Sequence, residues 1–252
     1  MKTLIDMHTH TGFSPDGEGT VEQSLAKAKE LGLAAFAITD HCDCNFRYKA
    51  DHYGDPEALK DGMMYGSGEY APASIVAQYE ASQHLEVLNF LCGIELGQPL
   101  QDIEFAEEIT SDKRLDFIIG SSHLVYGNDP YYDEFWQNIS VKEGISTYYE
   151  GIIDSLKVCS NFDVYGHLDY IIRYAPGKDT AYNWKDYSDY IDTILRMLIE
   201  KGKGIEINTS GLKYGLKNPN PCPDIIKRYH ELGGEIITTG SDAHKTEHIA
   251  YR

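Results

Sequence analysis

The sequence has few basic residues and no long hydrophobic run. Its 252 residues include 22 Lys and Arg against 40 Asp and Glu, a formal net charge of −18. A chain this acidic repels nucleic acid and anionic membranes. No apolar stretch approaches the roughly 20 residues that span a bilayer, and the N-terminus has no signal-peptide pattern. We therefore predict a cytoplasmic protein with no nucleic-acid or membrane partner; the sequence predicts no particular oligomeric state.

Cysteines are few and unpaired in pattern. There are five of them, irregularly spaced, which is typical of reduced thiols and not of a disulfide framework. Cys42 and Cys44 stand next to His41, but no second pair has the spacing of a thiolate metal site, so we expect free thiols. A glycine-rich fingerprint after the first strand is also missing, which weighs against a nucleotide-binding sheet.

Short β-branched runs alternate with longer helical patterns along the chain. The predicted strands are 3–7, 34–39, 90–95, 117–121, 164–167, 204–208 and 235–240. The predicted helices are 21–31, 75–85, 102–109, 146–160, 187–201 and 224–232. Seven strand-then-helix units predict parallel strands and right-handed crossovers in a barrel, with an open doubly wound sheet as the alternative.

No repeat, linker or low-complexity tract divides the chain, so we predict one domain over 1–252. Two polar stretches, at about 43–74 and 126–145, are long for loops and are expected to form lids or specificity loops. A closing helix is expected after the last strand. We therefore expect either a shortened C-terminus or an incomplete seventh unit at Arg252.

Histidines and acidic residues stand at the ends of six of the seven predicted strands. They are His8, His10, Asp40, His41, Glu95, His123, His167, Asp242 and His244. Only the sixth strand, ending on Asn208, departs from this pattern. The carboxyl ends of all strands in a parallel barrel meet on one face, so these side chains are expected to share a small volume. The pairs HxH and DxH each point one way, because strand side chains repeat with period two.

Such a cluster is costly to bury unless cations neutralise it. Neutral imidazole and ionised carboxylate are ligands for Zn²⁺, Mn²⁺ or Fe²⁺, and about eight donors imply two or three ions. A lone histidine at a strand end is usually a core residue, so the combined motifs carry this prediction. Asp16 lies in a turn-like Ser-Pro-Asp-Gly sequence, but its loop follows HxH, and we predict it as a ligand too. The other histidines are expected on the surface: His52, His84, His230 and His248.

These motifs resemble those of the PHP (polymerase and histidinol phosphatase) superfamily over nearly the whole chain. The resemblance implies a distorted (β/α)7 TIM-like barrel with a trinuclear metal site. It assigns His8, His10, Glu95 and Asp242 to one metal, and Glu95 bridges to a second held by His123 and His167. The third metal would take Asp16, His41 and His244, although many relatives have His where this chain has Asp16.

Within the superfamily the chain is most similar to monofunctional histidinol-phosphate phosphatases, by its length, its insertion after His41 and the segments 166–173 and 206–213. The resemblance implies hydrolysis of L-histidinol phosphate to L-histidinol and phosphate, a reaction of histidine biosynthesis. It also implies that Arg173 and Lys213 contact the phosphate. Lys213 stands where Arg is usual; it keeps the charge but loses the planar fork.

We expect no protein nucleophile: a water or hydroxide activated by two metals attacks phosphorus, and a cation such as Arg173 neutralises the phosphoryl oxygens. Acidic and aromatic residues of the long loops are expected to contact the organic part of this small phosphorylated substrate. They are Asp43, Phe46, Tyr48, Tyr126 and Asp129.

Three other functions stay open. The chain could hydrolyse another phosphomonoester, a nucleotide or a phosphotyrosyl protein, or it could be a non-catalytic PHP module that supports a partner. A metal-dependent amidohydrolase shares the barrel and an HxH start. That group usually has a carboxylated Lys or a Glu at the fourth strand, where this chain has Ser122-His123.

Overall fold

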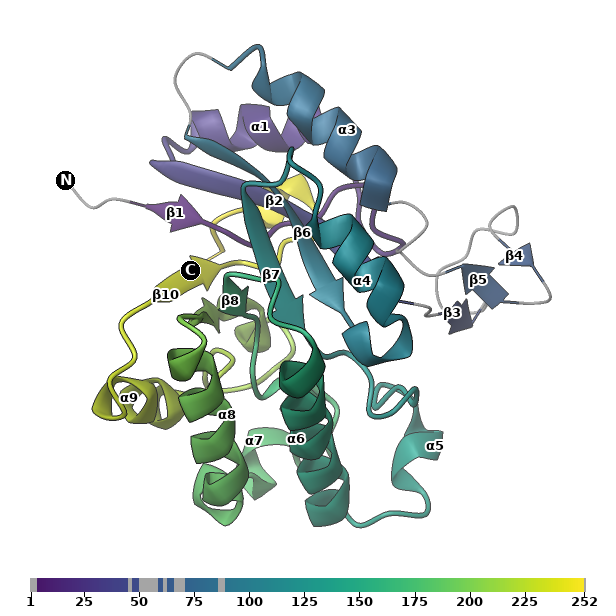
Figure 1. The fold of residues 1–252 in the computed structure, drawn as a ribbon, viewed down its shortest axis with the longest axis vertical. Helices are drawn as coiled ribbons and strands as arrows, with labels where there is room; N and C mark the ends of the chain where they lie inside the picture. Colours follow the sequence, from purple (N-terminus) through teal and green to yellow (C-terminus); the bar gives the residue numbers. More distant parts are fainter. Residues whose placement is uncertain are drawn as a thin grey trace.

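Seven parallel strands form the central sheet of the computed structural model, which describes residues 4–44, 47–49, 59–60, 63–65, 71–85 and 89–251 (Figure 1). The strands follow one another around the sheet in chain order. They are β1 (Ile5–Asp6), β2 (Ala35–Asp43), β6 (Phe90–Gly97), β7 (Phe117–Ser121), β8 (Val164–Tyr165), β9 (Gly204–Asn208) and β10 (Ile237–Gly240). The prediction of seven parallel strands is confirmed.

The sheet curls until its outermost strands, β1 and β10, approach each other. Met7 N donates to Thr239 O at 2.9 Å, and Asp242 N donates to His8 O at 2.8 Å. Beyond the strand ends, Thr9 and Ala243 form a parallel bridge. The sheet is therefore a nearly closed barrel and not an open doubly wound sheet. The HxH and DxH motifs lie side by side where it closes.

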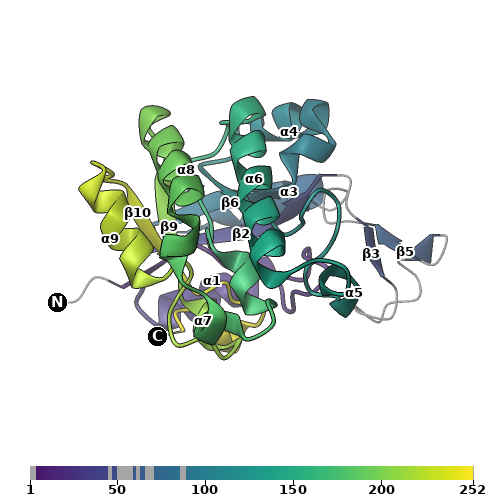
Figure 2. The ribbon, with the colours of Figure 1, turned by 90° about the horizontal axis from the view of Figure 1, so that it is seen from below.

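Helices cover the outside of this barrel. Figure 2 shows α9, α8, α6 and α4 in a row along one side, and Figure 1 shows α1 and α3 beside β2. On α8, Ile191, Ile194, Leu195 and Leu198 are buried, which is the i, i+3, i+4, i+7 stripe of a helix packed on a core. The helices are α1 (Val21–Glu30), α3 (Ala71–Ser82), α4 (Ile103–Thr110), α5 (Asp133–Trp136), α6 (Val141–Val158), α7 (Lys178–Ala181), α8 (Ser188–Glu200) and α9 (Pro223–Glu231).

Two boundaries differ from the predictions in a way that matters for the site. The second strand runs through the TDH motif to Asp43, and β6 continues to Gly97, because these ends pair in register with each other.

The predicted loop over 126–145 contains α5 and the first turn of α6. The predicted loop over 43–74 contains a small antiparallel sheet of β3 (Arg47–Lys49), β4 (Leu59–Lys60) and β5 (Met63–Tyr65).

The interior of the barrel is apolar near the start of the strands and polar near their ends. Ala37 of β2 packs in the apolar cluster, and Leu91 of β6 packs against it. His41 and Glu95 stand four residues further along the same two strands and therefore on the same face. The apolar cluster consists of Met7, Ala37, Phe117, Ile119 and Val164. It lies beneath the polar cluster of histidines and carboxylates at the carboxyl ends of the strands.

After β10 the described chain adds one turn of 3₁₀ helix (Thr246–His248), so the closing helix is not found within the described residues. In the part of the chain that the structure describes, no helix is both long and apolar enough to cross a membrane.

Candidate metal centre

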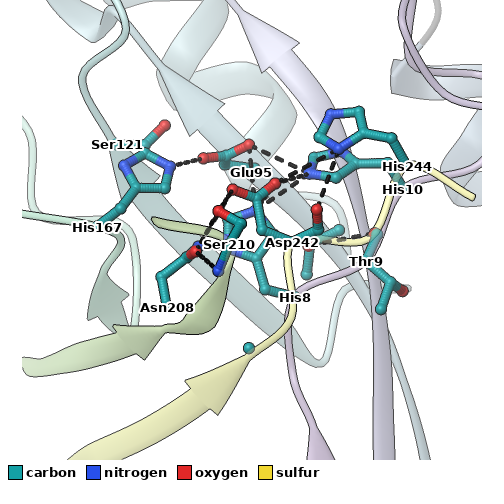
Figure 3. A network of polar contacts seen from close by, with 12 residues as sticks. His8, Thr9, His10, Glu95, Ser121, His167, Asn208, Ser210, Asp242 and His244 are labelled. Atoms are coloured by element: carbon teal, nitrogen blue, oxygen red, sulfur yellow. Dashed lines mark hydrogen bonds and ion pairs between the residues drawn. The ribbon is translucent and has the colours of Figure 1, made fainter. Parts of the chain in front are cut away.

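All nine predicted ligands meet at the carboxyl ends of the strands, with Glu95 between them. Figure 3 labels His8, His10, Glu95, His167, Asp242 and His244 among them. Oε1 of Glu95 lies 2.7 Å from Nε2 of His167 and 3.1 Å from Nε2 of His123. Oε2 lies 3.3 Å from Nε2 of His8 and 2.8 Å from Nδ1 of His41. One buried carboxylate therefore faces imidazoles from four strand ends.

Asp242 approaches the same cluster of side chains from the end of β10. Its Oδ1 lies 3.3 Å from Nε2 of His10 and 3.8 Å from Nε2 of His8. Asp242 and His167 both have positive φ, 51° and 24°. A left-handed backbone at a non-glycine residue costs on the order of 1–3 kcal/mol and is concentrated at functional sites. The chain accepts this cost at two of the predicted ligands.

Asp16, on the turn after the HxH motif, lies at the more exposed side of this cluster. Its Oδ2 lies 3.1 Å from Nε2 of His244, and its Oδ1 lies 3.5 Å from Nε2 of His41. The rings of His10 and His244 stack with centroids 4.1 Å apart. The structure therefore brings Asp16 beside the strand-end histidines, as the position of its loop predicts.

Several buried polar atoms of this cluster have no hydrogen-bond partner among the described residues. They are Nδ1 of His167 and a pair of atoms, Oε2 of Glu95 and Nδ1 of His41, that lie 2.8 Å apart as an ion pair without hydrogen-bond geometry. Nε2 of His8 and Nε2 of His10 face each other at 3.1 Å. Each unsatisfied buried group costs about 1–3 kcal/mol, which a coordinated cation would offset.

Four groups have donor atoms within 4.8 Å of one another, close enough to hold an ion. They are His10, His41 and His244; His8, His10 and Glu95; His8, His167 and Asp242; and His41, Glu95 and His123. Histidine and carboxylate together suit zinc and related transition metals. The residues present therefore fit divalent metal ions.

The electrostatics point the same way. Burial would raise the pKa of Glu95, but His123, His8 and His41 hold it well below its usual range. Burial would lower the pKa of His41, but Glu95 and Asp16 raise it to about 9. With no other cation, protons on the imidazoles balance the carboxylates. A divalent ion can take their place, because metal ligation displaces protons from its ligands.

Comparison with known proteins agrees with this geometry. Residues 6–210 match the PHP domain. The chain belongs to the PHP domain family. It is 31% identical to a probable histidinol-phosphatase of Clostridium acetobutylicum over 249 residues, 98% of this chain and 88% of that protein. It is 30% identical to a probable histidinol-phosphatase of Thermotoga maritima over 247 residues, 98% of this chain and 86% of that protein.

A solved structure is similar as well. The histidinol phosphate phosphatase of Lactococcus lactis, complexed with zinc, L-histidinol and phosphate, superposes with a TM-score of 0.75 at 26% identity. The match covers 97% of this chain and 87% of that one. The PHP barrel, predicted from the strand ends, is thereby confirmed as the fold.

The PHP centre, by which we mean the nine predicted ligands and the side chains bonded to them, includes two carboxylates that the prediction did not place there. Glu206, on β9, has Oε1 2.7 Å from Nδ1 of His8. Asp43, at the end of β2, has Oδ1 2.9 Å from Nδ1 of His123. Both could have been found from the sequence, because side chains near the carboxyl ends of parallel strands meet on one face. Glu206 is on the same face as Asn208, and Asp43 is on the same face as His41.

The assignment of Asp43 to the organic part of the substrate was wrong. Because β2 is longer than predicted, this residue belongs to the strand, is buried and bonds to His123 and Gln98. Of the other residues in that prediction, Tyr126 donates to Asp154 at 2.8 Å, and Asp129 accepts from Tyr131 N at 2.8 Å. Phe46 and the side chain of Tyr48 lie outside the described residues.

Asp40 of the TDH motif supports the PHP centre from behind. Its carboxylate accepts from the hydroxyls of Thr11 (2.9 Å), Ser14 (2.8 Å) and Ser74 (2.6 Å) and from Thr11 N (2.6 Å). These bonds tie β2 to the turn that carries Asp16. Ser14 also accepts from His41 N at 3.0 Å. The hydroxyl of Ser14 therefore links the turn directly to a predicted ligand.

The two residues predicted to contact the phosphate lie on the Asp242 side of the PHP centre. Arg173 is buried and donates to Asp242 Oδ2 at 3.2 Å, to Asn208 Oδ1 at 3.1 Å and to Asn220 Oδ1 at 3.0 Å. Lys213 is half-buried, and its Nζ donates to the carbonyl of Asp242 at 3.4 Å. Arg173 is thus held by three side chains, whereas Lys213 makes one long hydrogen bond and lies over the Tyr251 ring at 5.4 Å.

Of the remaining histidines, the three that the structure describes lie outside the PHP centre. His84 and His230 are exposed, as predicted, and His248 is half-buried on the turn after β10. His52 lies outside the described residues.

Proposed function

We propose that this chain is a metal-dependent phosphatase that hydrolyses L-histidinol phosphate to L-histidinol and phosphate in histidine biosynthesis. The observation that carries the proposal is the full set of predicted ligands gathered around Glu95. Relatives at 30–31% identity bear the name histidinol-phosphatase, and the Lactococcus structure holds zinc, L-histidinol and phosphate. A non-catalytic PHP module would need no such complete ligand set.

The centre would hold two or three divalent ions, zinc, manganese or iron. We assign the ligands as the resemblance does. They are His8, His10, Glu95 and Asp242; then Glu95, His123 and His167; then Asp16, His41 and His244. Bound ions of this kind lower the pKa of water and neutralise phosphoryl oxygens.

The side chains near the centre are not built as nucleophiles. Burial raises the pKa of the Cys42 thiol well above its usual range, so it stays protonated and unreactive. The hydroxyls of Ser14 and Ser210 donate to Asp40 and Asp242, which are not general bases for a serine. The work of the protein is to bind and orient the phosphate and to supply water.

The cations Arg173 and Lys213 would bind the phosphate. They lie on one side of Asp242, so a phosphoryl group beside that carboxylate would face two positive charges. Fixed charges aimed at the oxygens where negative charge develops are a large part of phosphoryl-transfer catalysis. Lys213 would bind as a point charge and Arg173 through whichever N–H groups the substrate reaches.

A wall of tyrosines would contact the organic part. The Tyr170 ring lies 5.1 Å from His123 and 5.0 Å from His167, and Tyr174 continues the wall 5.3 Å from Tyr170. Tyr131 adds a third ring 5.4 Å from Tyr174. Aromatic faces suit an imidazole ring and a protonated amine, the two groups of histidinol.

The test is to purify the protein, measure metal per chain by elemental analysis, and compare phosphate release from L-histidinol phosphate with a mononucleotide and p-nitrophenyl phosphate. Two or three ions per chain with a marked preference for L-histidinol phosphate are expected. The same ions with another preferred substrate would retain the phosphatase and discard the pathway. Metal-free, inactive protein would reject the proposal.

A further inference from the structure

Strand β9 is the only one of the seven whose end supplies no predicted ligand. The end of this strand nevertheless carries two polar side chains, Glu206 and Asn208, that are fully buried. They are two residues apart, so they point to the same face, toward the PHP centre. Figure 3 shows Asn208 beside Asp242 and His8. A strand that buries two such groups without coordinating an ion needs another explanation.

Glu206 bonds to the outer nitrogen of His8. Oε1 lies 2.7 Å from His8 Nδ1, while Oε2 accepts from His167 N at 3.0 Å and from Asn208 Nδ2 at 3.1 Å. An ionised carboxylate only accepts hydrogen bonds, so Nδ1 of His8 must carry a proton. In the neutral ring that binds a metal ion, Nε2 then keeps its lone pair, and this atom faces Glu95 at 3.3 Å.

The neighbouring backbone makes room for this pair. A Cβ at Gly240 would lie 2.3 Å from Glu206 Oε1 and 2.3 Å from the Cβ of His8. A side chain on β10 at that position would therefore displace both partners. The glycine permits the contact between His8 and Glu206, which are 198 residues apart in the chain.

Asn208 bonds to one of the two carboxylate oxygens of Asp242 and leaves the other for the PHP centre. Its Nδ2 donates to Asp242 Oδ2 at 3.3 Å, and its Oδ1 accepts from Arg173 Nη2 at 3.1 Å and from Ser210 N at 3.0 Å. Oδ2 of Asp242 also accepts from Arg173 Nη1 at 3.2 Å. The Ser210 hydroxyl, which has one proton to donate, lies 2.8 Å from this oxygen and 2.6 Å from Oδ1 of Asn208. Only Oδ1 remains for the histidines of the centre.

We propose that β9 is a positioning strand: Glu206 fixes the tautomer of His8, and Asn208 fixes which oxygen of Asp242 faces the ions, while neither residue is itself a ligand. Carboxylates that hold the outer nitrogen of a ligating histidine raise metal affinity in this way. The inference rests on the metal centre of the proposed function and is independent of which phosphoester is hydrolysed.

The first test is zinc affinity in Glu206→Gln, measured by competition with a chelator. A carboxamide must turn its NH₂ either toward Nδ1 of His8 or toward the donors His167 N and Asn208 Nδ2, so one contact becomes donor against donor. We expect zinc affinity to fall by about 10- to 100-fold. Circular dichroism and the Tm of the metal-free variant are expected to stay close to the unsubstituted protein, which separates positioning from folding.

The matched control is Asp163→Asn. Asp163 also accepts a hydrogen bond from a neighbouring strand, from Ile118 N at 2.8 Å, but it lies before β8, at the opposite end of the barrel. Its zinc affinity is expected to remain within twofold of the unsubstituted protein. An equal loss in both variants would mean that strand-to-strand bonds in general, and not the His8 contact, determine zinc binding, which would overturn the proposal.

A second measurement needs no variant at Glu206. Long-range ¹H–¹⁵N NMR of the zinc-loaded, histidine-labelled protein, with His8 assigned by loss of its signal in His8→Asn, reports which ring nitrogen carries the proton. We expect a protonated Nδ1 and a zinc-bound Nε2. Zinc on Nδ1, or unchanged affinity in a folded Glu206→Gln, would overturn the proposal. Zinc binding without turnover of L-histidinol phosphate would discard only the substrate.

Discussion

The PHP centre has an inner group (His8, Glu95, His167 and Asp242) and an outer group (Asp16, His41 and His244), and the two are held in different ways. Inner side chains are almost fully buried and are fixed by other residues, as Glu206 fixes His8 and Arg173 fixes Asp242. In the outer group the side-chain exposures are 31% for Asp16, 10% for His41 and 20% for His244. The outer side chains contact one another, Glu95 and the ring of His10.

This difference separates two tasks of the site. Rigid, fully supported ligands give a preorganised centre, whereas exposed ligands allow solvent and substrate to enter. Substitutions in the inner group should therefore remove metal altogether. Substitutions in the outer group should remove part of it, because water can replace a lost ligand at an exposed position.

The largest effect is expected from Glu95→Gln. Its two oxygens lie within 3.3 Å of four imidazoles, so neutralising it removes the charge common to the inner and outer groups. We expect loss of most bound metal in elemental analysis and a fall in kcat of at least about 10²–10³-fold. Glu104→Gln, on the exposed face of α4, is the control and should change neither quantity. Full metal content in Glu95→Gln would contradict the central role of this carboxylate.

Asp16→Asn should have a smaller effect. We expect the loss of at most one ion per chain and a fall in kcat of about tenfold, equivalent to about 1.4 kcal/mol. Elemental analysis beside Glu95→Gln provides the comparison. If Asp16→Asn loses all its metal, the outer group is as essential as the inner one, and the distinction between them fails.

The sequence was sufficient to predict which strand-end side chains meet, because a simple rule governs their positions. Parallel strands end on one face, so HxH, TDH and DxH could be placed together without coordinates. That rule could also have placed Glu206 and Asp43 on this face, but it does not say which histidine each contacts, since the His8–Glu206 and His123–Asp43 pairs join residues 198 and 80 positions apart. Which strand-end acid coordinates and which holds a histidine depends on these pairings.

Strand length was the second thing that the sequence did not reveal. The second strand continues through a polar motif to Asp43 because β6 pairs with it over eight residues, a tertiary effect that local propensity does not contain. The wrong role given to Asp43 followed from ending the strand at 39. The barrel closure between Met7 and Thr239 is likewise a contact across almost the whole chain.

Lys213→Ala tests the cations beside Asp242, Arg173 and Lys213, as a phosphate site. Because Lys213 contacts only the Asp242 carbonyl and the Tyr251 ring among the described residues, and no predicted ligand side chain, its removal should leave the metal content unchanged. We expect KM to rise about tenfold for every phosphomonoester, and inorganic phosphate to inhibit about tenfold more weakly, equivalent to about 1.4 kcal/mol. Lys213→Arg retains the charge and should preserve both constants within a few fold. A rise in KM for one substrate alone would instead place Lys213 near the organic part.

The smallest effect is expected at the tyrosine wall, from Asp129→Asn. Burial, Tyr174 and Asp129 raise the pKa of Tyr170 well above its usual range, so the Asp129 carboxylate lies close to that wall. A half-exposed carboxylate attracts a cationic substrate only weakly because water and salt screen it. We expect KM for L-histidinol phosphate to rise about threefold at low salt while KM for p-nitrophenyl phosphate stays constant. Asp133→Asn, on exposed α5, is the control, and an equal rise for both substrates would remove Asp129 from substrate selection.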